Sequence, residues 1–188
     1  MEKKSNGGDF LPDNYEVPAG SGGYMKLQDG ENRFRIMDRP IIGYEYWNTD
    51  KKPIRSKEQW ATLPKDIQVG LDGKPGLVKH FWAMVVWNYA EEEIQILELT
   101  QKHILSSIQT LAKDPDWGTP LGYDLKINKK GKGLDTEYSV VAIPHKTVSQ
   151  EIQDVYLEKS PIRLEALYEG GNPFEKMATP TGAEDMPF

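Results

Sequence analysis

Apolar and polar residues alternate along most of the central part of the chain, which predicts β-strands. In the segment 32–37, Phe34 and Ile36 face one side and Arg33 and Arg35 the other, as expected of a half-buried strand. Further strands are predicted at 41–47, 81–87, 94–99, 121–127 and 134–143. The polar turns between the last four predict two antiparallel pairs.

Three segments carry helical signals. The first lies between Thr100, which we expect to cap it, and Pro115, which cannot continue it. A second short helix is predicted at 149–157, and a third at 56–60, where the sequence SKEQW has the form of a capping box. The apolar face of the first helix has a period of 3.6 residues and consists of Ile104, Leu105, Ile108, Leu111 and Ala112.

This order of elements predicts a mainly β fold, an OB-fold-like Greek-key barrel of five or more strands with one or two helices and flexible termini. A β-sandwich would give much the same order. Gly43 interrupts the strand at 41–47, where it fits a bulge. We expect a flexible arm at 1–23, one folded domain at 24–168 and a disordered acidic tail at 169–188.

Composition narrows the classes of function. Of the 188 residues 38% are hydrophobic and 28% charged, and we expect neither a membrane span nor a secretory signal, hence a cytoplasmic protein, in the host cytoplasm if viral. There is no cysteine, and the scattered His80, His103 and His145 have no metal-ligand spacing, so we expect no metal and no cofactor. The net charge of -6 argues at first sight against a nucleic-acid partner.

No enzyme motif is present. The sequence GKGLDT at 131–136 is not a phosphate-binding loop, because it lacks the earlier glycine and the helix that such a loop requires. No acidic residue is paired with a histidine or serine in a recognisable motif. We therefore expect a protein that is not an enzyme.

Basic residues interleave with aromatic residues on the predicted strands. A protein that binds single-stranded nucleic acid needs cations along the phosphates. It also needs flat rings on which unpaired bases stack. The candidates are Arg33, Arg35, Arg39, Tyr44, Tyr46, Trp47, Lys79, Trp82, Trp87, Tyr123, Lys126, Lys129, Lys130, Lys132 and Tyr138. Aromatic residues on strands are more often core, and we expect one of Trp82 and Trp87 to be so. The lysines at 126–132 would also suit an edge that resists aggregation.

The segments 122–127 (GYDLKI) and 129–136 (KKGKGLDT), followed by Tyr138, resemble a stretch of bacteriophage single-stranded-DNA-binding proteins. The resemblance extends more weakly over 25–47 and from Phe81 to Pro144. It implies an OB-fold that binds single-stranded DNA.

The last residues, Glu184, Asp185, Met186, Pro187 and Phe188, resemble the acidic tip with a terminal Pro-Phe of bacterial and phage single-stranded-DNA-binding proteins. The resemblance implies that this tip recruits replication, recombination or repair proteins. A mobile anionic end would also compete with DNA for a basic groove.

Two classes of function remain open. The first is a non-catalytic coat that binds single-stranded DNA without strong sequence preference, protects it, recruits partners through the tail, and can form oligomers. The alternative is a structural or adaptor β-protein of a virus, with the aromatic residues in its core and a protein as its partner. RNA would fit the same groove, so the choice of DNA depends on the resemblance.

Overall fold

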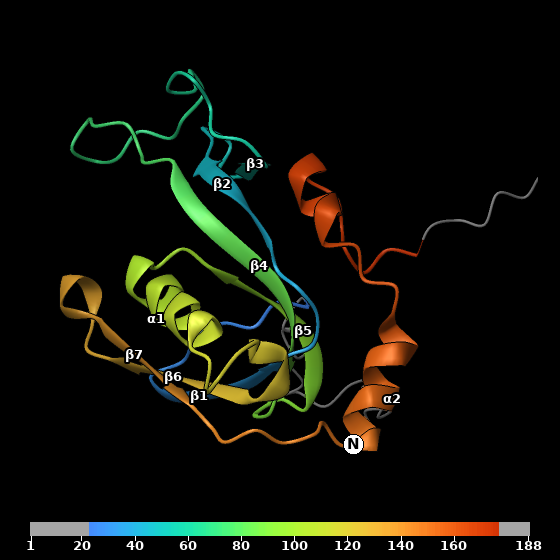
Figure 1. Ribbon diagram of the computed structural model, residues 1–188. Coiled ribbons are helices and arrows are strands. Elements are labelled where there is room, and N and C mark those ends of the chain that lie inside the picture. Colours follow the sequence, from blue (N-terminus) through green and yellow to red (C-terminus); the bar gives the residue numbers. More distant parts are fainter. Residues whose placement is uncertain (1–22, 177–188) are drawn as a thin grey trace, which may run out of the picture.

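The computed structural model describes residues 23–176, which form one antiparallel sheet of seven strands with two α-helices (Figure 1). The strands are β1 (Gly30–Ile36), β2 (Ile41–Trp47), β3 (Pro53–Ser56), β4 (Lys79–Asn88), β5 (Glu93–Leu99), β6 (Asp124–Lys130) and β7 (Glu137–Ala142). The helices are α1 (Lys102–Lys113) and α2 (Gln150–Lys159), with short 3-10 helices η1 (Pro120–Gly122), η2 (Gly133–Asp135) and η3 (Leu164–Glu169). The strand order is β3-β2-β4-β1-β6-β7, and β5 pairs with the other edge of β4.

β1 and β2 lie end to end along one edge of β4. Ile36 pairs with Val86 and Ile41 with Ala83, so the residues at 37–40 stand opposite only two residues of β4. The chain bulges at this point, and the bend lets β1 continue to β6 while β2 continues to β3.

The bulge predicted at Gly43 is wrong, because Gly43 stays in register opposite Phe81. A Cβ at this position would meet the carbonyl oxygen of Ser56 and the ring of Tyr168. Glycine is therefore required by the close approach of these neighbours.

Apolar layers cover both faces of β4, which explains its long apolar run FWAMVVW. On the first face, α1 packs with Ile104, Leu105 and Ile108 against a core from β1, β4, β5 and β6. On the second face, the segment with α2 and η3 packs with Ile152, Leu164 and Leu167. We call these the α1 face and the α2 face. Trp87 lies in the core of the α2 face, as expected for one of the two tryptophans of β4, and Trp82 is half-buried on the α1 face.

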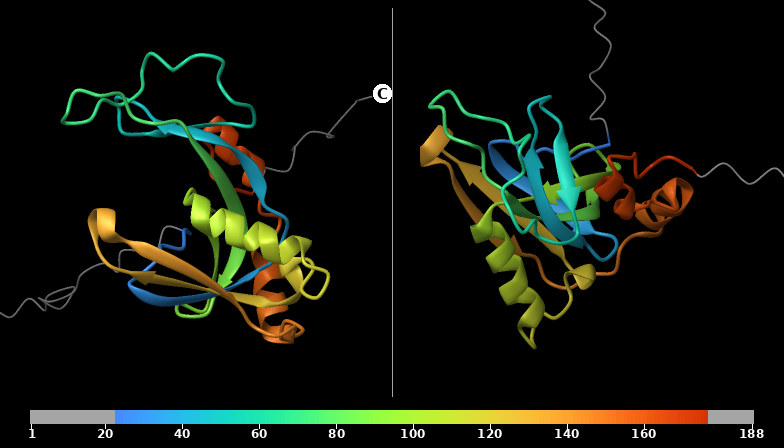
Figure 2. Two further views of the ribbon diagram at one scale, coloured as in Figure 1. Left: turned by 60° about the vertical axis from the view of Figure 1, so that its left-hand side comes forward. Right: turned by 90° about the horizontal axis from the view of Figure 1, so that it is seen from above.

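The sheet curves but does not close into the expected barrel (Figure 2). Within residues 23–176, no strand pairing joins β7 to β5. Val140 and Ala142 of β7 instead pack against the core that includes Leu105 and Ile108 of α1. β7 thus contacts α1, and its outer edge pairs with no described strand.

Several predicted elements are confirmed, with shifted ends. β6 begins later than predicted because η1 occupies the residues before it. β7 begins later than predicted because η2 occupies the residues before it. α2 is capped by Ser149, whose Oγ accepts from the Ile152 amide at 3.4 Å. The cap of α1 is Gln101 rather than Thr100. No described helix is long and apolar enough to cross a membrane.

The helix predicted at 56–60 is wrong. Ser56 ends β3, and its Oγ accepts from the Glu58 amide at 3.2 Å, the bond of a turn. The same serine signal that begins a helix at 149 begins a loop here, because β3 pairs with β2 and takes Ser56 into the sheet.

Candidate nucleic-acid interface

A cavity of about 830 Å³ opens on the α1 face, between the start of β4 and the first turns of α1. This volume lies within the range of protein ligand sites. We call this cavity, together with the smaller one described next, the α1 groove. The strand side contributes Leu77, Lys79, His80 and Trp82, and the helix side Gln101, Lys102, Leu105, Ser106 and Gln109.

A second cavity of about 170 Å³ adjoins the first at Trp82, which lines both. Its walls are almost wholly apolar and include Met84, Ile108 and Leu121, and Arg39 lies among the lining residues. α1 lines the first cavity with Leu105 and Gln109 and the second with Ile108 and Ala112, residues on one stripe of the helix. Trp82 therefore stands at the middle of the groove, with cationic residues toward both ends.

His80 and Trp82 line the groove from β4, and strand parity places Tyr44 of β2 on the same face of the sheet. His80 and Trp82 are two residues apart on β4, and Tyr44 of β2 pairs with His80 in register. The ring centroids of Tyr44 and His80 are 5.2 Å apart. Tyr44 and Trp82 are both half-buried, so each keeps part of its ring accessible while the rest packs on the sheet.

The segments that line the first cavity carry no acidic residue. Asp and Glu are absent from 73–90, from 99–113 and from 125–134, which hold the start of β4, α1 and the β6 side of the hairpin. The loop before β4 and the tip of the β6–β7 hairpin project to the same side of the molecule, the left in Figure 1 and in the left view of Figure 2. The net charge of -6 therefore does not describe this side of the protein.

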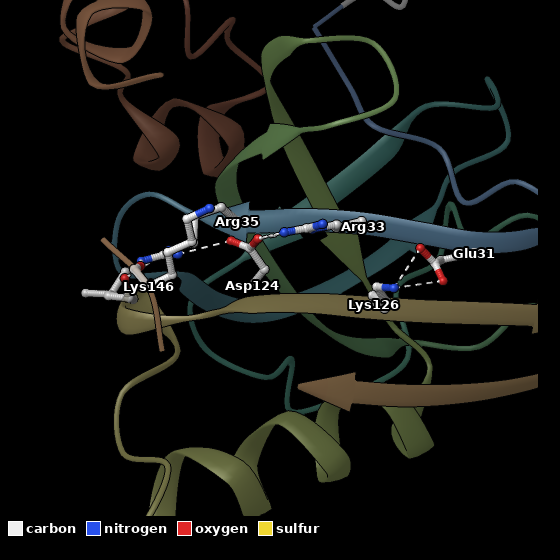
Figure 3. A network of polar contacts seen from close by, with 7 residues as sticks. Glu31, Arg33, Arg35, Asp124, Lys126 and Lys146 are labelled. Carbon is white, nitrogen blue, oxygen red and sulfur yellow. Dashed lines mark hydrogen bonds and ion pairs between the residues drawn. The ribbon is translucent and has the colours of Figure 1, made fainter. Parts of the chain in front are cut away.

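Four predicted phosphate ligands form ion pairs with acidic residues, and Figure 3 shows three of them, Arg33, Arg35 and Lys126. Arg33 Nη2 lies 2.6 Å from Asp124 Oδ2, and Arg35 Nη1 lies 3.0 Å from Asp124 Oδ1. Lys126 Nζ lies 3.0 Å from Glu31 Oε1. Arg35 is buried, and the structure does not offer it to a ligand.

The neighbouring side chains stabilise the negative charge of the Asp124 carboxylate. Burial alone would raise its pKa, but hydrogen bonds from Arg33, Arg35 and Tyr89 outweigh burial, and the pKa lies below its ordinary value. Arg33 also lies over the ring of Tyr89, 4.5 Å from its centroid. This network fixes β1 to β6 and leaves little of the arginine charge for a phosphate.

Three predicted stacking residues are buried and offer no free ring face. Tyr123 is fully buried, and its hydroxyl donates to the Gly118 carbonyl at 3.0 Å. The Tyr46 hydroxyl donates to Asp66 at 2.8 Å. Trp87 is covered by the α2 segment. These residues hold the sheet together, and the structure does not bring them to the groove.

The remaining predicted residues are accessible but lie at different places. Trp47 is exposed at the end of β2, and Tyr138 is half-buried against the core near α1. Lys129 Nζ lies 3.8 Å from Asp29. At the hairpin, the exposed lysines that form no ion pair with any described residue are Lys130 and Lys132, and Glu137 lies opposite Lys130 in the strand pair.

Sequence reasoning missed the helix side of the groove. Lys102, Gln101 and Gln109 face Trp82 across the first cavity, and His80 stands beside Tyr44. The absence of acids from 99–113 was the signal that could have pointed to the helix. The predicted tail residues at 184–188 lie outside the described part of the chain. Within 23–176, no three histidine or acidic residues gather as metal ligands would.

The chain is similar to a protein of Escherichia phage T5. That protein is named a probable ssDNA-binding protein, and the two are 26% identical over 153 residues. The match covers 70% of this chain and 59% of the phage protein, so the chain spans somewhat more than half of that relative's length. No family model matches the chain, and no solved structure matches it.

Proposed function

We propose that this protein binds single-stranded DNA without strong sequence preference through the α1 groove. The observation that carries the proposal is Trp82, which lies between two adjoining cavities with Lys79 and Lys102 on one side and Arg39 on the other. An unpaired base stacking on Trp82 would place its phosphates near these cations. Neither the stacking nor the phosphate contacts depend on which base is bound.

The surroundings of the groove favour a polyanion. Acid-free segments form its strand and helix walls, and Lys130 and Lys132 extend the basic surface along the hairpin. Tyr44 supplies a second accessible ring beside His80. Trp47 is a further exposed ring on β2, at the end distant from the bulge. The similarity to the T5 protein supports the same ligand.

The function is that of a non-catalytic coat that protects single-stranded DNA. The acidic end at 184–188 would recruit replication, recombination or repair proteins, an assignment that depends on the resemblance of its sequence. The Phe188 side chain would give a partner an apolar anchor, and Glu184 and Asp185 would give it charges to bind.

Tryptophan fluorescence tests the proposal directly. Titration with oligo(dT) should quench the emission, duplex DNA should have little effect, and high salt should reverse the quenching. If about five phosphates are contacted, the slope of log K against log salt should lie near -3 to -4. A slope near zero would contradict DNA binding through these cations. If neither DNA changes the emission, the structural or adaptor function becomes the better one. Equal binding of oligo(dT) and oligo(rU) would broaden the ligand to RNA.

A further inference from the structure

The tip of the β6–β7 hairpin presents one fully exposed leucine, Leu134. Pairing of the two strands continues up to Lys130 and Glu137, and η2 then closes the tip. The Asp135 amide donates to the Lys132 carbonyl at 3.1 Å, and the Thr136 hydroxyl donates to the Gly133 carbonyl at 2.8 Å. These bonds hold the backbone on both sides of Leu134 in one arrangement.

Glycine is needed at this tip. Gly131 has φ +87°, and a Cβ there would collide with the backbone of Asp135. The backbone of the two sides is therefore packed together beneath the leucine. Leu134 is thus held outward on a closed turn, with no place in either core of the sheet.

The charges beside Leu134 favour a nucleic acid over a protein core. Lys130 and Lys132 precede it and form no ion pair with a described residue. Asp135 and Glu137 follow it, and the four lysines at 126–132 outnumber these two acids. The hairpin projects to the same side of the molecule as the loop that leads into the α1 groove (Figure 2). A strand that leaves the groove on this side would pass near the tip.

We propose that Leu134 is a wedge that acts where single-stranded DNA meets a duplex, inserting against the terminal base pair while the hairpin lysines contact the backbone. Proteins use leucine and similar side chains to enter base steps, at the cost of unstacking them. The last pair of a duplex is stacked on one side only, so insertion there costs less than insertion within the helix. The inference rests on the proposed function, because it gives the α1 groove a junction as its substrate.

The test uses the full chain and a hairpin duplex with an oligo(dT) tail, made with a 5′ or a 3′ tail. A 2-aminopurine in the base pair next to the tail reports unstacking by a rise in fluorescence. Oligo(dT) of the tail's length is the reference ligand. Leu134→Ser is compared with Leu71→Ser, because Leu71 is equally exposed but lies in the loop before β4.

We expect the wild type to raise the 2-aminopurine signal with at least one of the tailed hairpins. Leu134→Ser should lose most of this rise and bind the tailed hairpin about tenfold more weakly, a change of about 1.4 kcal/mol. Its affinity for oligo(dT) should stay unchanged, and Leu71→Ser should behave as the wild type. Thermal melts of both variants should match the wild type, since both side chains are exposed.

Three results would overturn the wedge. The first is a wild type that binds oligo(dT) but leaves 2-aminopurine unchanged, which leaves the proposed function intact. The second is an equal signal from Leu134→Ser and the wild type, which would instead suit a leucine that docks a protein. The third is an equal loss in Leu71→Ser. A wild type that binds neither DNA overturns the proposed function as well.

Discussion

Arg35 and Asp124 face each other across the β1–β6 pair, with Arg35 Nη1 3.0 Å from Asp124 Oδ1 and side chains only 4% and 3% exposed. Arg33 approaches the same carboxylate from the next position on its face, 2.6 Å from Oδ2. Arg35 also donates to the carbonyls of Leu121 and Lys146. The Arg35–Asp124 pair therefore ties β1 to β6, and Arg35 also ties β1 to the segments before and after the β6–β7 hairpin.

Replacing Asp124 with Asn should destabilise the protein strongly. The substitution keeps the shape but leaves the buried Arg35 without a counter-charge, a loss expected at about 3 to 5 kcal/mol of unfolding free energy. Urea unfolding measures it. Glu31→Gln is the matched control, because it removes the exposed partner of Lys126 and should cost less than about 1 kcal/mol. Equal effects of the two substitutions would contradict the role of Asp124.

A second buried acid should make stability depend on pH. Burial raises the pKa of Glu45 from 4.5 to about 8, helped by the neighbouring Glu98 and opposed by Arg55. Arg55 Nε lies 3.2 Å from Glu45 and Arg55 Nη2 lies 2.6 Å from Glu98, so one cation lies between two carboxyl groups.

The direction of this pH dependence follows from proton binding to Glu45. Between pH 4.5 and about 8 the folded protein holds a proton on Glu45 that the unfolded chain has lost, so this group's contribution to stability falls as pH rises. In Glu45→Gln this dependence should disappear. Melting temperatures of both proteins from pH 5 to 8.5 measure it, and parallel curves would show that Glu45 ionises normally.

Trp82 and Trp87 allow a test of the groove within one strand, because they lie on opposite faces of β4. Trp82→Leu keeps an apolar side chain on the α1 face but removes the ring, and should weaken oligo(dT) binding about tenfold. Trp87→Leu should lower stability and leave the affinity unchanged. Both are measured by fluorescence anisotropy of labelled oligo(dT). A larger loss of affinity in Trp87→Leu would place the site on the α2 face.

Local sequence patterns predicted six of the seven described strands, the two antiparallel pairs and both α-helices, because periodicity and capping act over a few residues, but they missed β3. Partners distant in the sequence were not predictable in this way. Strand parity placed Arg33 and Arg35 on one face, but it could not show that Asp124, about ninety residues later, lies opposite them. The same limit explains why the predicted barrel is wrong, because closure of the sheet depends on how distant parts of the chain, such as α1, pack.

The groove was predictable only on its strand side. Trp82, Lys79 and Tyr44 lie on strands whose alternation is visible in the sequence. Lys79 and Trp82 line the first cavity, and Tyr44 lies beside His80, which lines it too. Gln101 and Lys102 meet them only through the packing of α1 on the sheet. Tyr123 shows the reverse case, a ring beside a basic segment that tertiary packing buries completely.

The tail should compete with DNA if the acidic end at 184–188 reaches the basic side of the protein. Deleting residues 181–188 removes Glu184, Asp185 and the Pro-Phe end. Affinity for oligo(dT) should then rise at low salt, and the gain should vanish at high salt because screening weakens the competition. Replacing Glu184 and Asp185 with Gln and Asn tests the charge alone. Unchanged affinity at low salt would count against competition by the tail.

The basic residues of the groove should be visible in the salt dependence of binding. Each phosphate contact removed should make the slope of log K against log salt shallower by about 0.7. Lys79→Gln and Lys102→Gln, on opposite walls of the first cavity, should each do so, and the double variant should lose about twice as much. Lys176→Gln is the control, because this exposed lysine lies beside Phe174 and Glu158 at a cavity away from α1. If all three single variants reduce the slope equally, DNA binding depends on the overall charge of the protein, and the α1 groove is not the binding site.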